Sequence, residues 1–434
     1  MDENPHREFS LWGFIFMYAC DIICRYRNRV IRVLIYRRDD MERLKKQLIE
    51  KYGGEDIRGV VSPLRICPLG AHVDHQGGRV TGVALDSSVN LVYTPNEEGF
   101  IRIQSMDFPD EEHFHLDNIP EMVPASWGNY IRGAALSLKR DFVLKKGFNA
   151  IISGKLPIGG LSSSAAVTTA YLMALCDVND IEVDKMALVH YSHWVETDYI
   201  GLKNGILDQA ANILSQKNKL MVMDCNTDAY QLVEKASHMP EPEFVVVYSG
   251  ISTALIGTDY NNRVDECKVA SWLLHELSEN HVPSLKDSIL RDISEEVFQA
   301  HKEWLPGRFK KRAEHYFTEQ NRVTEGIEAW AQGDLERFGQ LMNASGESSV
   351  HQYECGCPEL TTIFEILKET PGVYGARFSG AGYRGCCIGL INPEYKDSIQ
   401  EKIEATYPKI HPKYKDVYNI HFCKVADGAH YASL

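Results

Sequence analysis

Between Leu156 and Ala166 the chain reads L-P-I-G-G-L-S-S-S-A-A. This stretch lies between an apolar, strand-like run (Phe148 to Ile152) and an apolar run with helical spacing (Val167 to Cys176). A strand, a tight turn and a helix in this order direct backbone N–H groups and the positive end of the helix dipole toward one point. Glycine has no side chain, so a phosphate can approach the backbone closely. The stretch therefore predicts an anion site, with a nucleotide phosphate as its natural occupant.

The stretch differs from a Walker loop, because the spacing G-x-x-x-x-G-K-[ST] is missing and no lysine follows the glycines. Taken alone, it could also be an ordinary glycine- and serine-rich surface loop. Three distant stretches strengthen the functional interpretation. They are S-P-L-R-I-C-P-L-G-A-H-V-D-H-Q-G-G (62–78), G-L-K-N-G-I-L-D-Q (201–209) and G-A-R-F-S-G-A-G-Y-R-G-C-C (375–387).

Together the four stretches resemble the GHMP small-molecule kinases, the family of galactokinase, homoserine kinase, mevalonate kinase and phosphomevalonate kinase. The resemblance is ordered along most of the chain. Y-N-N-R-V-D-E-C (260–267) and W-G-N-Y (127–130) are similar to the sugar-1-kinase branch, and K-R-A-E-H-Y-F (311–317) is similar to its galacturonate-specific members. The resemblance implies an α+β, two-domain GHMP kinase fold. It has an N-terminal mixed α/β domain, a C-terminal ferredoxin-like domain and the active site between them.

The length and composition agree with two domains. A chain of 434 residues with 44% hydrophobic content can bury a large core. We expect a non-catalytic extension at 1–40, an N-terminal kinase domain at 41–210 and a C-terminal kinase domain at 211–434. The net charge of −14 argues against a nucleic-acid partner, because there is no basic field to neutralise a phosphate backbone. The sequence leaves the oligomeric state open.

The N-terminal segment has an unusual composition. Leu11 to Cys24 is apolar apart from Asp21 and is followed by a basic stretch from Arg25 to Arg38. The apolar run is shorter than the roughly 20 residues that span a bilayer. A signal peptide would carry its positive charge before the apolar run. We therefore expect no membrane partner, although a membrane-tethered form stays an alternative that cell fractionation would test. Eleven cysteines without metal-ligand spacing indicate free thiols in a reducing compartment, and so a cytoplasmic location.

Phosphoryl transfer requires a protein to position two substrates, neutralise charge and steer one proton. The resemblance implies that Asp208 faces the anomeric hydroxyl of a sugar as the catalytic base, and that Arg65 is the active-site arginine. A guanidinium beside the carboxylate would keep it ionised and stabilise the developing alkoxide. The alternatives are a helix-capping or surface aspartate and a solvated arginine at a strand edge.

The same resemblance implies that ATP and Mg²⁺ take part. Ser164 and Glu196 would bind the metal as hard oxygen donors, and Glu196 lies twelve residues before Asp208, as in galactokinases. Galactokinases usually carry P-x-G-x-G-L-S-S-S, whereas this loop is one residue shorter. A second glycine turn would either approach the phosphates or only let two elements pack closely. The expected nucleotide-binding residues are Pro157, Gly159, Gly160, Leu161, Ser162, Ser163, Ser164, Gly380 and Gly382.

His72 and Asp74 match the H-x-D motif that reads sugar hydroxyls, and Tyr260 matches a sugar-contacting tyrosine. His72 and His75 could instead indicate a metal site, but a third ligand is missing. Ala71 stands where galactokinases carry a glutamate that accepts a hydrogen bond from the C6 hydroxyl. A uronic acid is negatively charged at C6, so the loss of that glutamate removes a repulsion. We hypothesise that His75, which replaces a tyrosine, donates to the sugar carboxylate.

The sequence thus predicts an ATP-dependent sugar-1-kinase that converts D-galacturonate to its 1-phosphate. Galactokinase is the alternative substrate assignment. A second alternative is a galactokinase-like sensor that binds sugar and nucleotide without turnover. The serine loop, Asp208 and Arg65 occur together, which favours catalysis over sensing.

Overall fold

The computed structural model describes residues 40–154, 159–251, 259–278 and 281–434. Pro157 and the apolar run from Leu11 to Cys24 lie outside these residues. The predicted strand–turn–helix is confirmed, since a strand covers Gly147–Gly154 and a helix covers Ser163–Val178.

Twelve strands form one sheet, whose main path runs in the order β4-β3-β5-β2-β11-β8-β10-β9. β1 pairs with β2 and β12, whereas β6 pairs with β2 and β7. The strands are β1 (Arg58–Ile66), β2 (Arg79–Asn96), β3 (Phe100–Ser105), β4 (Glu111–His115), β5 (Gly147–Gly154), β6 (Lys219–Asp224), β7 (Tyr230–Glu234), β8 (Glu243–Tyr248), β9 (Val373–Ser379), β10 (Cys386–Ile391), β11 (Asn419–Ala426) and β12 (His430–Ala432).

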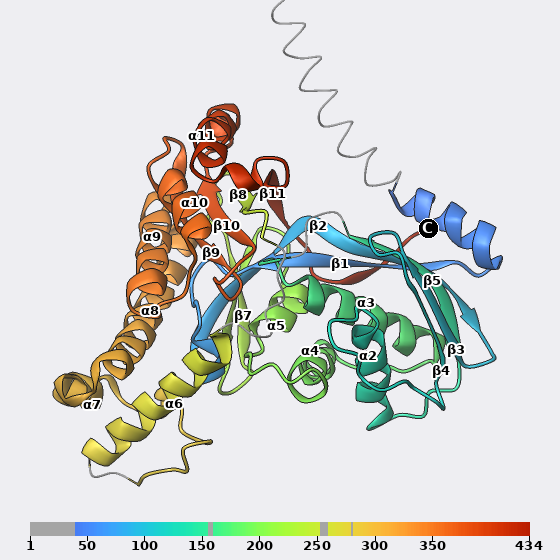
Figure 1. Cartoon of the computed structure of the whole chain (residues 1–434), viewed down its shortest axis with the longest axis horizontal. Helices are drawn as coiled ribbons and strands as arrows, with labels where there is room; N and C mark the ends of the chain where they lie inside the picture. The colour runs from blue at the N-terminus through green and yellow to red at the C-terminus, as the bar shows by residue number, and fades with distance from the viewer. Residues whose placement is uncertain (1–39, 155–158, 252–258, 279–280) are drawn as a thin grey trace, which may run out of the picture.

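Helices cover both halves of this sheet. In Figure 1, α2 to α5 lie against the broad part formed by β1 to β5, and α8 to α11 stand beside β8 to β10. The helices are α2 (Asn129–Lys139), α3 (Ser163–Val178), α4 (Lys185–Trp194), α5 (Leu207–Leu214), α6 (Tyr260–Leu277), α7 (Glu295–His301), α8 (Gly307–Gln332), α9 (Leu335–His351), α10 (Pro358–Lys368) and α11 (Lys396–Ile410).

The expected ferredoxin-like sheet is present in the C-terminal half. β8, β9, β10 and β11 occur in this order along the chain, and their spatial order is β11-β8-β10-β9. All three pairings are antiparallel. Helices separate β8 from β9 and β10 from β11, which is the βαββαβ arrangement of that fold.

β2 joins the two halves of the sheet. It pairs with β5 along one edge, and Leu85 and Ala84 pair with Val425 and Ala426 of β11. The hydrogen-bonded sheet therefore continues from one half into the other through the pairing of β2 with β11. The division of the domains at residue 210 stays a prediction.

A helix covers residues 40–52, at the start of the expected N-terminal kinase domain. Its Leu44 and Leu48 are fully buried against Val92 of β2 and Ile151 of β5. This helix therefore belongs to the packed fold. Within the described ranges, no helix is long and apolar enough to cross a membrane. The nine cysteines in those ranges are free thiols.

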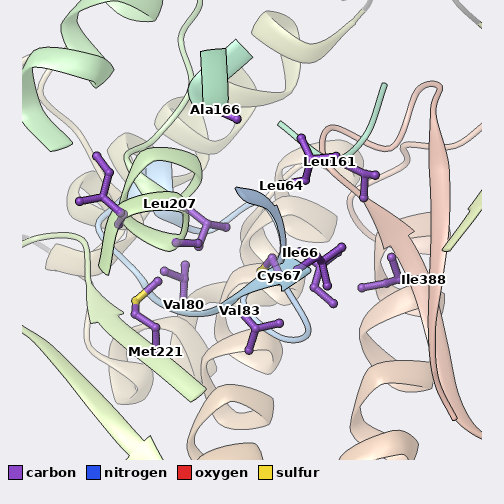
Figure 2. Packing of buried hydrophobic residues seen from close by; sticks show 14 of the residues in the cluster. Leu64, Ile66, Cys67, Val80, Val83, Leu161, Ala166, Leu207, Met221 and Ile388 are labelled. Atoms are coloured by element: carbon purple, nitrogen blue, oxygen red, sulfur yellow. The ribbon is translucent and has the colours of Figure 1, made fainter. Parts of the chain in front are cut away.

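The predicted catalytic motifs share one buried core. Leu64 and Ile66 flank Arg65 on β1, Leu161 precedes Ser162, and Leu207 precedes Asp208. Figure 2 shows these leucines and Ile66 gathered around a common centre, with Ile388 of β10 approaching from the ferredoxin-like sheet. Burial of the apolar neighbours restricts the polar residues between them, because close-packed side chains have little freedom to move.

Candidate active site

Arg65 and Asp208 form an ion pair at the centre of the site. Arg65 Nε donates to Asp208 Oδ1 at 2.7 Å, and Nη2 lies 2.6 Å from the same oxygen. The Arg65 side chain is 3% exposed and that of Asp208 is 26% exposed. The guanidinium end of the pair is therefore dry, while about a quarter of the Asp208 side chain stays accessible to solvent.

Ser162 holds the second carboxylate oxygen. Its hydroxyl donates to Asp208 Oδ2, a contact that the sequence did not predict. Ser162 has φ 55°, in the left-handed region, and its side chain does not cap α3. The Ser162 side chain therefore leaves the backbone N–H groups in the first turn of this 16-residue helix uncapped.

The serine loop is attached to β1 and to the turn between β9 and β10. Arg65 N donates to Leu161 O at 3.2 Å. Ser379 Oγ donates to Gly160 O at 2.5 Å, and Cys386 Sγ donates to Gly159 O at 3.0 Å. The motif near residue 160 and the motif near residue 380 therefore meet.

The contact between these two loops requires glycine on both sides. A Cβ on Gly160, which has φ +80°, would lie 2.8 Å from the backbone nitrogen of Cys386. A Cβ on Gly385 would lie 2.6 Å from the Gly159 carbonyl carbon. An ideal Cβ on Gly380 would lie 3.1 Å from Gly160 Cα, and one on Gly382 would lie 2.8 Å from Cys355 Sγ. Close packing accounts for Gly380 and Gly382, and their contact with nucleotide stays a prediction.

Glu196 lies in a short π-helical turn, Val195–Tyr199, and is 2% exposed. Asn204 Nδ2 donates to its Oε2 at 2.5 Å, whereas Oε1 is buried without a hydrogen-bond partner. Burial raises the pKa of Glu196, the charge of Asp208 raises it further, and nearby polar side chains including Ser164 oppose the shift. A buried carboxylate oxygen without a partner, next to a serine, fits a cation with hard oxygen ligands.

Asp74 lies beside the loop that carries Asp208. An ideal Cβ on Gly205 would lie 2.4 Å from Asp74 Oδ2, so only glycine at this position allows the loop to pack this closely against Asp74. Burial raises the pKa of Asp74 to about 6, and the negative charge of Asp208 contributes. Burial also raises the pKa of Tyr260, and the charges of Asp74, Asp208 and Glu196 act in the same direction. Four acidic or phenolic groups from distant parts of the sequence thus share one site.

The two histidines of the 62–78 stretch already have protein partners. His72 stacks on Tyr353 with ring centroids 4.1 Å apart. Gln76 Nε2 donates to His75 Nδ1 at 3.0 Å, and His75 Nε2 lies 3.1 Å from the Tyr353 hydroxyl. Burial lowers the pKa of His75 to about 3 and that of His72 well below its usual value. Both rings are therefore neutral near pH 7, and their contacts with sugar stay predictions.

Ala71 is 3% exposed, and α8 holds its backbone from the far half of the chain. Glu319 Oε1 accepts from Gly70 N at 2.7 Å and from Ala71 N at 3.0 Å. Its Oε2 accepts from Arg322 Nε at 2.7 Å. Sequence reasoning did not identify Glu319, because a lone acid on a charged amphipathic helix gives no signal of burial.

His315 completes this support by donating from Nε2 to Ala71 O at 2.8 Å. His315 lies in the K-R-A-E-H-Y-F string, which the sequence analysis singled out by resemblance. That string did not indicate which residue His315 contacts. Asn204, which holds Glu196, lies likewise in the 201–209 stretch.

Two cavities open near these residues. One of about 580 Å³ is lined by Asp74, His75, Asn204, Gly205 and Lys268 among others. The other, of about 610 Å³, lies between α6 and α8 among charged side chains such as Arg263 and Glu354. Within the described part of the chain, no group of three or more His, Cys, Asp or Glu side chains could by itself hold a metal ion.

Comparisons with known proteins identify relatives of this chain. Residues 129–216 match the N terminal domain of GHMP kinases, and residues 326–409 match the GHMP kinases C terminal domain. The galacturonokinase of Arabidopsis thaliana is 39% identical over 412 residues, which cover 88% of this chain and 96% of that protein. The galactokinase of Roseiflexus sp. is 29% identical, over 90% of this chain and 96% of that protein. The crystal structure of Lactococcus lactis galactokinase complexed with galactose superposes with a TM-score of 0.81 at 28% identity, covering 89% of this chain and 98% of that one.

Proposed function

The chain belongs to the GHMP kinase family, and we propose that within this family it is an ATP-dependent sugar-1-kinase that converts D-galacturonate to D-galacturonate 1-phosphate. The observation that carries the proposal is the clamped Asp208 carboxylate. Arg65 and Ser162 orient it from two sides, and about a quarter of its side chain stays open to an incoming substrate.

Asp208 accepts the proton of the anomeric hydroxyl as the sugar oxygen attacks the γ-phosphorus of ATP. The new bond joins the anomeric oxygen to phosphorus. The bond between the γ-phosphorus and the bridging β,γ-oxygen breaks, and its electron pair leaves with ADP. Transfer of this kind depends chiefly on position and on charge stabilisation, with one group that takes the proton.

Arg65 and Ser162 make Asp208 suitable for this task. The positive charge of Arg65 lies beside the carboxylate and would stabilise the negative charge that develops on the sugar oxygen as its proton leaves. The two donors also fix the plane of the carboxylate, because Arg65 holds Oδ1 and Ser162 holds Oδ2. Because Arg65 Nη1 also donates to Gly160 O at 3.3 Å, the same side chain links the base to the predicted phosphate loop.

Mg²⁺ fits the pair formed by Ser164 and Glu196. The buried Oε1 of Glu196 has no partner, and hard oxygen donors together with phosphate oxygens and water complete a magnesium shell. When bound, the ion would neutralise charge on the nucleotide phosphates. Asn204 would position the second oxygen of Glu196, and the raised pKa of this carboxyl would return toward normal beside a cation.

The neighbourhood of position 71 supports galacturonate over galactose. Ala71 supplies no carboxylate to repel a charged C6 group. The adjacent acid, Glu319, is fully buried and has both oxygens occupied by protein donors, with Arg322 as its counter-ion. The 39% identity with a galacturonokinase supports the same assignment, whereas the galactokinase of Roseiflexus is less similar, at 29% identity.

A panel of galacturonate, galactose and glucuronate, each with ATP and Mg²⁺, tests the proposal. We expect the highest kcat/KM with galacturonate and a 1-phosphate as the product, identified by its phosphorus NMR coupling to the anomeric proton. A clear preference for galactose would replace the substrate by the galactokinase alternative. Binding of sugar and ATP without any turnover would support a sensor instead.

A further inference from the structure

Arg384 is a cation beside the predicted phosphate loop for which the mechanism above has no role. It lies in the turn between β9 and β10, directly before Gly385, whose backbone packs against Gly159 and Gly160. Gly385 O accepts from Ser249 N at 2.8 Å, which fixes the turn from the other side. The residue that carries this guanidinium is thus anchored next to the serine loop.

The guanidinium of Arg384 has no carboxylate partner in the part of the chain that the structure describes. The side chain is half-buried, and burial lowers its pKa, with only the hydroxyls of Tyr130 and Tyr248 close enough to oppose the shift. A partly dehydrated cation without a counter-ion costs free energy, which a bound anion would recover.

We propose that Arg384 binds the triphosphate of the nucleotide from its place beside the serine loop. This inference rests on the proposed kinase function and assigns a further substrate-contacting residue to it. An arginine fork matches phosphate oxygens with two parallel N–H donors.

The charges of the site create a need for such a cation. Glu196, Asp208 and Asp74 are acids, and Arg65 is already paired with Asp208. The serine loop between Gly159 and Ser164 contains no basic residue. ATP adds about four negative charges, of which one divalent ion neutralises two. Phosphoryl transfer relies on cationic groups to balance such charge, so the site needs a cation from outside the loop.

The neighbours of Arg384 identify the nucleotide, rather than the sugar, as its ligand. Tyr130 lies within electrostatic range of both Arg384 and Glu196, the predicted metal ligand. Tyr248 contacts the loop itself, since its Cε2 lies 3.5 Å from an ideal Cβ on Gly159. The preceding residue, Tyr383, is instead close to Cys355 and to Tyr260, which is a predicted sugar-contacting residue. The turn therefore directs consecutive residues to the two substrates.

Replacement of Arg384 by glutamine tests the proposal in the full chain. Calorimetric titration with Mg·ATP, in the absence of sugar, should show the dissociation constant rising about 10- to 100-fold, as expected for the loss of charge-assisted hydrogen bonds. The KM for galacturonate and that for galactose should stay unchanged. Arg384→Lys, which keeps the charge but loses the fork, should recover part of the affinity.

Thermal melting separates binding from a structural role. Without nucleotide, Arg384→Gln should melt at or above the temperature of the unmodified protein, because the variant removes an unpaired cation. The shift that Mg·ATP adds should shrink. Arg337→Gln, at an exposed ion pair with Glu325, is the matched control and should leave nucleotide affinity as it was.

An unchanged ATP dissociation constant in Arg384→Gln would overturn the proposal. A rise in KM for galacturonate but not for galactose would also overturn it and would assign Arg384 to the sugar carboxylate. Failure of the proposed function is distinguishable, because it would appear in the unmodified protein as absent ATP binding or absent galacturonate turnover.

Discussion

Asp208→Asn is the substitution that most directly examines the mechanism. Asparagine keeps the shape of the side chain, and its Oδ1 can still accept from Arg65. Its amide nitrogen cannot accept the proton of the anomeric hydroxyl, nor the hydrogen bond that Ser162 donates to Oδ2. The variant therefore removes the proton acceptor and one orienting contact while it leaves the serine loop in place.

The expected losses in turnover and in stability differ in size. Removal of a positioned base costs about 10²- to 10⁴-fold in kcat, or roughly 3 to 5 kcal/mol in the barrier. The Arg65 side chain is only 3% exposed, but that of Asp208 is 26% exposed, so solvent screens the pair. We expect the free energy of unfolding to fall by only about 1 to 2 kcal/mol. A domain that is stable by about 5 to 15 kcal/mol stays folded after such a loss.

A coupled assay of ADP release gives kcat, and titration with Mg·ATP gives nucleotide affinity. We expect kcat to collapse while the ATP dissociation constant changes less than about threefold, since no lost contact belongs to the nucleotide. Asp198→Asn is the matched control, because Asp198 is an exposed carboxylate two residues from Glu196. Near-normal kcat in Asp208→Asn would refute the assignment of the base, and an equal fall in Asp198→Asn would show that the loss reflects general charge changes.

Three further outcomes are expected. Ala71→Glu should lower kcat/KM for galacturonate by about 30- to 1,000-fold, which corresponds to roughly 2 to 4 kcal/mol of charge repulsion. The neutral control Ala71→Gln should lower it far less. An equal loss for galactose would refute the charge argument. The KM for sugar should rise as the pH falls below about 6, where buried Asp74 becomes protonated. Because the native pKa of Asp74 lies above that of an ordinary aspartate, its contribution to stability is lost as the pH rises through about 6. Asp74→Asn should therefore flatten the KM profile and melt higher at pH 7. A chain that starts at Met41 should be monodisperse in light scattering and fully active in the kinase assay, because Leu44 and Leu48 already pack on Val92 and Ile151. Aggregation of this shorter chain would place residues 1–40 within the catalytic fold.

The local elements around the site were predictable from sequence. The strand before the serine loop and the helix after it follow from apolar spacing over about ten residues on each side. Family resemblance over four motifs identified the two-domain fold and singled out Asp208 and Arg65 as the catalytic pair.

Several contacts of the site were beyond sequence reasoning. Ser162 was expected to cradle phosphate, yet its hydroxyl donates to Asp208, 46 residues away. His75 was predicted to donate to a sugar carboxylate, and this stays a prediction; the structure adds that its ring nitrogens contact Gln76 and Tyr353. Arg384 stood in a quoted motif, but only its isolation from every described carboxylate indicates an anion as its partner.

The sequence by itself determined which short segments form strands, turns and helices and which residue types carry the chemistry, because both depend on neighbours within a few positions. The tertiary structure decided which of these groups meet. Arg65 pairs with Asp208 across 143 residues, and Glu319 holds the backbone of Ala71 across 248. Such pairs depend on the path of the sheet through β2 and on the packing of α8 against the 62–78 stretch. Side-chain periodicity contains no information about that path, because it records which face of an element is buried and not what covers it.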